Sequence, residues 1–197
     1  MLLDRRRFLI APVAPLAFGA LVGLSSNALA DVQDGKAQDG KEQGGDLATK
    51  LAYPKVVVLV RHAERAEEPK GDPALSEDGV KRAERLAKML GKSGVTHLIA
   101  SEFQRTQQTL APLALAANVR VQIAKASDAA AAQSAVETLP RGSLIVVAGH
   151  SNTIPLISKL LTGGNAEIKL EETEFDRIFI VTQWGPGKQS TLFEMRY

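Results

Sequence analysis

Residues 55–62 read Lys-Val-Val-Val-Leu-Val-Arg-His, and the prediction of the fold rests mainly on this stretch. Five consecutive apolar residues, four of them valine, predict a strand buried on both faces, as in a parallel sheet. The run ends abruptly at Arg61 and His62. In open α/β sheets, ligands bind just beyond the carboxyl ends of the strands. Arg61 can bind an anion and His62 can act as a nucleophile, and both lie where a site is expected. A strand that merely emerges into solvent would end in the same way.

Two later segments repeat this pattern of an apolar strand followed by polar residues. Val-Thr-His-Leu-Ile-Ala at 95–100 precedes Arg105, and Leu-Ile-Val-Val-Ala at 144–148 precedes His150. The carboxyl ends of parallel strands meet at the same edge of a sheet, so two arginines and two histidines are predicted to converge there. Such a set describes a phosphate pocket that contains an imidazole nucleophile.

Three short motifs resemble those of the histidine phosphatase superfamily, in its phosphoglycerate-mutase-like branch 1. They are Arg61-His62-Ala63, the segment 101–109 with Arg105-Thr106, and Gly149-His150-Ser151. Each motif is short, but all three follow predicted strands in the expected order, and the resemblance runs from residue 55 to the C-terminus. One departure is that the commonest form of the first motif has glycine where this chain has Ala63.

The order of elements predicts an α/β domain: a three-layer α/β/α sandwich with a mostly parallel sheet and an antiparallel edge formed by a C-terminal hairpin. Helical spacing and capping residues predict four helices, and short alternating runs predict the remaining strands. The helices are expected over 76–90 with Gly91 closing the first, 105–117, 128–139 and 153–161, and the further strands over 119–123, 177–183 and 190–196.

The N-terminal 30 residues are expected to be a cleaved export signal. Arg5-Arg6-Arg7 form a basic region, an apolar stretch covers 10–24, and Ala28-Leu29-Ala30 fits a small-x-small cleavage site. The arginines resemble a twin-arginine signal, although a Sec signal or a retained membrane anchor would look similar. Residues 31–50 contain few apolar side chains and are expected to be a flexible linker, which leaves 51–197 as the catalytic domain. We expect a periplasmic or secreted bacterial protein that meets the membrane only transiently, through its signal.

Composition excludes several classes of function. Removal of the signal takes away three Arg and one Asp, which leaves 21 basic and 21 acidic residues, so the basic character of the chain is no argument for nucleic-acid binding. The chain has no cysteine and only three histidines, none in a zinc-binding spacing, so we expect no metal and no cofactor.

The predicted pocket assigns a role to each of its residues. Arg61 and Arg105 offer planar pairs of donors to a phosphate, and His150 and Asn152 add further donors. His62 is expected to attack phosphorus in line and to carry a phosphohistidine, which water then hydrolyses.

The proton donor to the leaving group is less well defined. The resemblance implies a Glu or Asp downstream of the second arginine, near a helix start, and Asp128 lies in that region, where it also suits a helix N-cap. Glu64, next to the nucleophile, is the other candidate. Branches of the superfamily that have no such acid act on good leaving groups such as phosphohistidine.

The sequence therefore predicts an exported, metal-independent phosphatase that hydrolyses phosphomonoesters of a small molecule or a phosphoprotein. Two alternatives stay open: a phosphohistidine or phosphoprotein phosphatase, and a non-catalytic protein that binds phosphorylated ligands on the same fold. A mutase is disfavoured because the chain is short for one. A serine hydrolase is disfavoured because the segment 149–153 ends in Thr rather than Gly and no histidine follows His150. The segments 64–74 and 165–176 are expected to shape the mouth of the pocket.

Overall fold

The computed structural model describes residues 53–185 and 188–197. The predicted export signal (1–30) and linker (31–50) lie outside the described residues. Within the part of the chain that is described, no helix combines the length and the apolar character needed to cross a bilayer.

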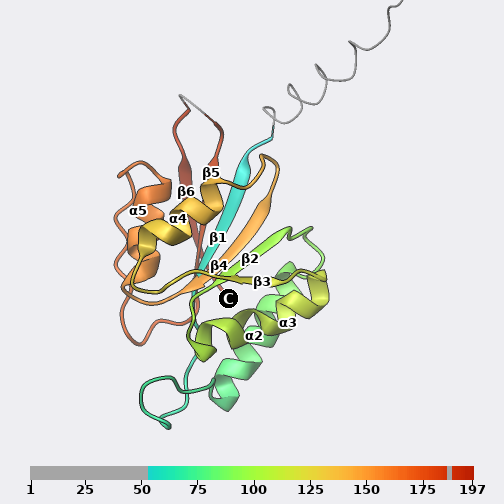
Figure 1. Cartoon of the computed structure of the whole chain (residues 1–197), viewed down its shortest axis with the longest axis vertical. Helices are drawn as coiled ribbons and strands as arrows, with labels where there is room; N and C mark the ends of the chain where they lie inside the picture. The colour runs from blue at the N-terminus through green and yellow to red at the C-terminus, as the bar shows by residue number, and fades with distance from the viewer. Residues whose placement is uncertain (1–52, 186–187) are drawn as a thin grey trace, which may run out of the picture. The chain divides into compact units, whose positions relative to one another are not determined.

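The described residues form a mixed sheet of six strands and four helices, which confirms the predicted α/β class (Figure 1). The elements, in chain order, are β1 (Lys55–Arg61), α2 (Glu77–Leu90), β2 (His97–Ala100), α3 (Gln104–Ala117), β3 (Val121–Ile123), α4 (Ala129–Glu137), β4 (Leu144–Gly149), α5 (Thr153–Leu161), β5 (Arg177–Gln183) and β6 (Thr191–Arg196).

The strand order is β3-β2-β4-β1-β5-β6. The first four strands in this order run parallel, whereas β5 is antiparallel to β1 and β6 is antiparallel to β5, as the predicted terminal hairpin requires. Strand β4 lies between β1 and β2, and Ala148 pairs with both Val60 and Ala100. The three strands that carry the motifs are therefore neighbours whose carboxyl ends are in register.

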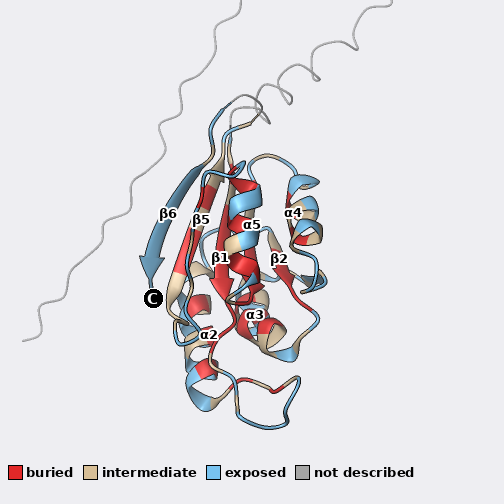
Figure 2. Ribbon diagram, turned by 90° about the vertical axis from the view of Figure 1, so that its left-hand side faces the viewer, coloured by how far each residue is buried: buried red, intermediate tan, exposed pale blue. Residues whose placement is uncertain are grey.

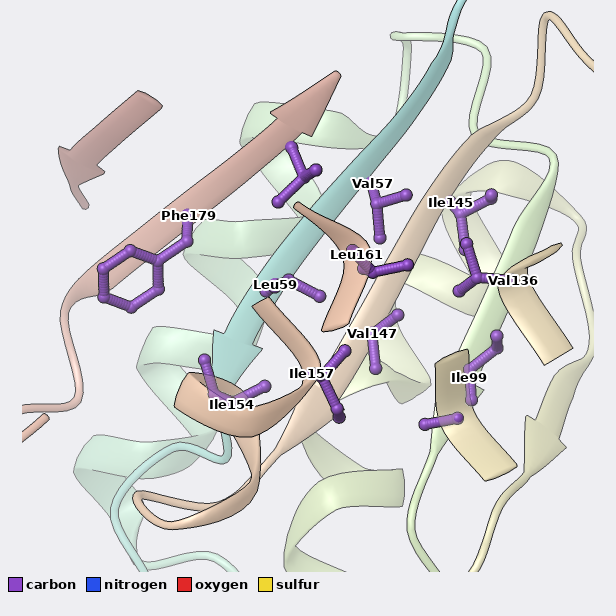
Figure 3. Close-up of a cluster of buried hydrophobic side chains, with 12 residues drawn as sticks. Val57, Leu59, Ile99, Val136, Ile145, Val147, Ile154, Ile157, Leu161 and Phe179 are labelled. Carbon is purple, nitrogen blue, oxygen red and sulfur yellow. The ribbon is translucent and has the colours of Figure 1, made fainter. Parts of the chain in front are cut away.

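Two apolar clusters lie on opposite faces of the sheet because successive strand residues point to opposite sides. Val57 and Leu59 of β1 pack with side chains of α4 and α5, whereas Val58 and Val60 pack with side chains of α2 and α3. Figure 3 shows the first cluster, with Ile154, Ile157 and Leu161 of α5 over the central strands. Buried strands of this kind have no polar face, which explains the run of valines, while β6 at the edge of the sheet is exposed along its length (Figure 2).

The helices begin where capping residues were predicted. The Ser76 hydroxyl accepts a hydrogen bond from the Gly79 amide at the start of α2, and the Asp128 carboxylate accepts one from the Ala131 amide at the start of α4. Two strands are shorter than predicted, since β2 begins at His97 and β3 at Val121.

Candidate active site

The carboxyl ends of β1, β2 and β4 surround a cavity of about 590 Å³. Its lining residues come from all three strand ends and from three loops: Arg61, His62, Arg65, Gly71, Phe103, Arg105, Ala126, Ser127, His150, Ser151, Asn152 and Glu172. The structure thus brings together the five predicted residues Arg61, His62, Arg105, His150 and Asn152. Both predicted mouth segments also contribute.

His62 stands directly after β1, and its backbone fixes the position of its ring proton. The His62 amide donates to the Gly149 carbonyl at 2.8 Å, and Nδ1 lies 2.7 Å from the carbonyl oxygen of Ala63. A carbonyl oxygen can only accept, so Nδ1 carries the proton in the neutral ring. The lone pair is therefore on Nε2, the nitrogen that remains free to act as a nucleophile.

The surroundings of His62 keep its ring neutral at physiological pH. Burial lowers the pKa of His62 to about 3; the nearby Arg61 also lowers it, and the Ala63 carbonyl only partly offsets these effects. The ring is 4 % exposed and lies 5.3 Å from the ring of His150, centroid to centroid. An unprotonated imidazole among cationic side chains is suited to attack an anionic phosphate.

Arg61 is buried at the end of β1 and is surrounded by the segment 171–175. Its Nη1 donates to the carbonyl oxygens of Glu171 and Glu174 at 2.9 and 3.3 Å. Its Nη2 donates to the Glu172 carboxylate at 2.9 Å, and its guanidinium carbon lies 4.1 Å from the centre of the Phe175 ring. The Nε donor of Arg61 has no hydrogen-bond partner among the described residues.

Arg105 is the second residue of α3, and the amide of the preceding Gln104 donates to the Asp72 carboxylate at 2.9 Å. Its guanidinium stacks 4.3 Å above the centre of the Phe103 ring, and Nη1 lies 3.6 Å from the Asp72 carboxylate. Neither Nε nor Nη1 has a hydrogen-bond partner among the described residues. A buried guanidinium with unused donors that faces a cavity is suited to bind an anion.

A chain of hydroxyl groups orients His150 at the end of β4. Its Nε2 lies 3.0 Å from the Ser101 hydroxyl, which lies 2.8 Å from the Thr106 hydroxyl. Thr106 donates to the Phe103 carbonyl, so it accepts from Ser101, and Ser101 in turn accepts from His150. Burial lowers the pKa of His150 to about 4, aided by Arg105, so the ring is neutral before an anion binds.

The first motif is tied to the second through one buried hydroxyl. The Ala63 amide donates to the Thr109 hydroxyl at 2.9 Å, and that hydroxyl donates to the Arg105 carbonyl at 2.7 Å. All of these groups are fully enclosed in the core except the Arg105 side chain, which reaches the cavity. The link fixes the position of the nucleophile relative to the second arginine.

The structure places neither candidate general acid at the cavity. The Glu64 carboxylate accepts hydrogen bonds from Arg82, and the Nη2 of Arg82 lies 2.6 Å from it. Burial alone would raise the pKa of Glu64, but the bonds from Arg82 lower it. Asp128 caps α4 through the Ala131 amide and is absent from the lining. Both carboxylates thus have structural partners, and the identity of the general acid stays a prediction.

Sequence reasoning missed Glu172, the acidic side chain among the residues that line the cavity. Its carboxylate accepts hydrogen bonds from Arg61 Nη2 and from the Ser151 hydroxyl. The segment 165–176 has neither helical nor alternating periodicity, so the sequence indicated only that it shapes the mouth. Phe103 and Arg65 were also missed, although each is adjacent to a motif.

No group of three or more His, Cys, Asp or Glu side chains within 53–185 and 188–197 is arranged to hold a metal ion. The cavity is instead lined by three arginines and two histidines, which together suit an anionic ligand.

These features define an α/β domain with a pocket that suits an anionic ligand and that contains His62 with a free Nε2 lone pair. Residues 57–128 match the sequence profile described as histidine phosphatase superfamily (branch 1), a range that includes Arg61, His62 and Arg105. This match confirms, over that part of the chain, the resemblance to the superfamily seen in the sequence motifs.

Solved structures of superfamily members share the fold. A candidate phosphohistidine phosphatase SixA from Nakamurella multipartitia is 21 % identical, with a TM-score of 0.53 over 73 % of this chain and 96 % of that one. The protein histidine phosphatase SixA in complex with tungstate is 17 % identical, with a TM-score of 0.58 over 72 % and 96 %. A mycobacterial glucosyl-3-phosphoglycerate phosphatase is 15 % identical, with a TM-score of 0.55 over 71 % and 97 %. No curated protein sequence matches the chain.

Proposed function

We propose that this protein is a metal-independent phosphatase that hydrolyses phosphorylated substrates through a phosphohistidine intermediate on His62. The observation that carries the proposal is the state of His62: a neutral ring whose Nδ1 proton is held by the Ala63 carbonyl, in a cavity lined by arginines. Its free Nε2 lone pair supplies the nucleophile, and Arg61 and Arg105 supply the charge that a phosphoryl group needs.

The reaction follows in two steps. Nε2 of His62 attacks phosphorus, the bond from phosphorus to the leaving group breaks, and the charge on the phosphoryl oxygens is balanced by the two arginines. A water molecule then attacks the phosphohistidine, and inorganic phosphate leaves as the P–N bond breaks. His150 stabilises the phosphoryl group most strongly when it is protonated, and the arrival of a dianionic phosphate favours that protonation.

The second candidate function, a phosphohistidine or phosphoprotein phosphatase, is favoured by the positions of Glu64 and Asp128. Neither carboxylate lines the cavity, so the geometry offers no ready proton donor to an alcohol leaving group at either predicted position. A phosphoramidate such as phosphohistidine needs less assistance, because its nitrogen leaving group takes up a proton readily. The structures with similar folds include proteins described as phosphohistidine phosphatases, in keeping with this candidate.

We further propose that the protein acts outside the bacterial cytoplasm, in the periplasm or beyond. The basic, apolar and small-residue regions of the first 30 residues support this proposal. N-terminal sequencing of the protein recovered from the periplasmic fraction tests it, and Asp31 is the expected first residue. Recovery of the intact chain from the cytoplasm alone would contradict it.

The test of catalysis is hydrolysis of an aryl phosphate and of phosphohistidine by the purified protein in the presence of a chelator. We expect wild type to turn over both, and His62→Ala to lose on the order of 10³-fold or more in rate. His97→Ala is the matched control, because His97 lies at the start of β2 and is not among the lining residues. Activity that survives in His62→Ala would refute the nucleophile, and phosphate binding without any turnover would favour the non-catalytic alternative.

A further inference from the structure

Arg61 donates hydrogen bonds from both terminal nitrogens in the absence of any ligand. Nη1 is committed to two backbone carbonyls of the segment 171–174, while Nη2 is held by the Glu172 carboxylate. Nε has no partner among the described residues. Nε and Nη2 share one edge of the planar guanidinium, and Nη2 carries a second N–H that points away from this edge. A phosphate that binds this edge through two parallel hydrogen bonds therefore competes with Glu172 when the carboxylate occupies the Nη2 N–H on that edge.

Glu172 is held at the cavity by side-chain contacts that can be reversed. Its side chain is 81 % exposed, whereas that of Arg61 is 4 % exposed. Its other partner is the hydroxyl of Ser151, the residue that follows His150 in the third motif. An exposed carboxylate loses little when it moves into water, since solvent replaces both contacts. The backbone carbonyls that bind Nη1 do not need to move with it.

The positive charge of the cavity lining explains why a carboxylate lies there. Arg61 is buried, and a buried cation without a counter-charge is unfavourable. Arg65 and Arg105 line the same cavity and add to its positive charge. The hydrogen bond from Ser151 and the charge of Arg61 lower the pKa of Glu172, so it is the anion that compensates Arg61 at neutral pH.

We propose that Glu172 is an internal competitor for the phosphate subsite: its carboxylate occupies the donors of Arg61 and Ser151 in the free enzyme and is displaced by the phosphoryl group of the ligand. This inference rests on the proposed function, because it assigns Arg61 to phosphate binding. Its consequence for the reaction is that Glu172 weakens the binding of product phosphate and returns to Arg61 when phosphate leaves.

The test is calorimetric titration of inorganic phosphate into the purified wild type, Glu172→Gln, Glu172→Ala and Glu167→Gln proteins. Glu167 is an exposed glutamate of the same segment that does not line the cavity, so Glu167→Gln removes the same charge without removing the competitor. We expect phosphate to bind Glu172→Gln and Glu172→Ala about three- to tenfold more tightly than wild type, and Glu167→Gln to match wild type.

A crystal structure with tungstate provides the second measurement, since it separates displacement from a general effect of charge. We expect tungstate on Arg61 Nε and Nη2, with the Glu172 carboxylate moved away. A Glu172 carboxylate that stays on Arg61 beside bound tungstate overturns the proposal. So does unchanged or weaker phosphate affinity in both Glu172 variants.

These measurements distinguish failure of the inference from failure of the proposed function, because binding requires no turnover. A protein that binds phosphate more tightly in the Glu172 variants but hydrolyses no substrate would support the competitor and refute the phosphatase. A protein that hydrolyses substrates but in which Glu172→Gln loses rate without a gain in phosphate affinity would make Glu172 a proton donor, and would overturn the competitor.

Discussion

Lowering the pH from 7 to 5 should destabilise this domain, because two histidines of the cavity are buried in the neutral form. The pKa of His62 is lowered to about 3 and that of His150 to about 4, whereas an unfolded histidine has a pKa of about 6.5. The unfolded chain therefore binds these protons first. The stability that the neutral rings confer is complete above about pH 6.5, and it is lost as the pH falls toward the two lowered values.

The size of this loss follows from the linkage between protonation and folding. A pH of 5 lies about 1.5 units below the pKa of an unfolded histidine. The resulting loss in unfolding free energy is about 2 kcal/mol for each ring and about 4 kcal/mol for both. This is a large fraction of the roughly 5–15 kcal/mol that stabilises most domains. The carboxylates with lowered pKa values lose their contributions at more acidic pH, so the window from 7 to 5 isolates the histidines.

Urea unfolding followed by circular dichroism at pH 7, 6 and 5 measures the effect. We expect the unfolding free energy of wild type to fall across this range. His62→Asn and His150→Asn should each remove about half of the dependence, and the double variant nearly all of it. A wild-type stability that is flat between pH 7 and 5, or a double variant as pH-sensitive as wild type, would refute the assignment of neutral buried rings.

Two further predictions concern the packing behind the nucleophile. Thr109→Val leaves the buried Ala63 amide without an acceptor and should cost about 1–3 kcal/mol in unfolding free energy together with a loss of kcat, whereas Thr173→Val at an exposed position should change neither. Gly79→Ala would place a methyl group 2.0 Å from the Glu64 carbonyl oxygen, so it should lower the unfolding free energy by about 1–3 kcal/mol and reduce activity by shifting the first motif; a fully stable and active variant would show that α2 can move aside.

The positions of the arginines and histidines could be predicted because they depend on strand ends. A strand buried on both faces is visible in the sequence as an apolar run, and the residue after it must lie at the edge of the sheet. The sequence does not show directly that β4 lies between β1 and β2. The three motifs can form one site only if their strands are neighbours, and the pairing of β4 with both β1 and β2 confirms this.

Other features could not be predicted because they depend on contacts across long stretches of chain. Glu172 binds Arg61 over a separation of 111 residues, and nothing in its own segment has a regular period. Gly91 was expected to close α2 and does so, with a φ of −61° rather than the left-handed backbone that glycine often adopts at a helix end. A side chain there would instead lie 2.9 Å from the Ala116 side chain of α3, so close packing of the two helices requires the glycine. The sequence shows the glycine, but it does not show whether the glycine is required by the backbone conformation or by the close packing of α2 against α3.

The hydrogen bond between His62 Nδ1 and the Ala63 carbonyl bears on how this domain can acquire new substrates. The reactive form of the nucleophile is selected by the peptide backbone, and the Ala63 methyl group anchors that backbone against Leu75 and Ala83. Side chains at the mouth can therefore be exchanged during evolution or engineering without disturbing the nucleophile. Variation of the two mouth segments, with the strand ends left intact, is the route by which specificity can change fastest.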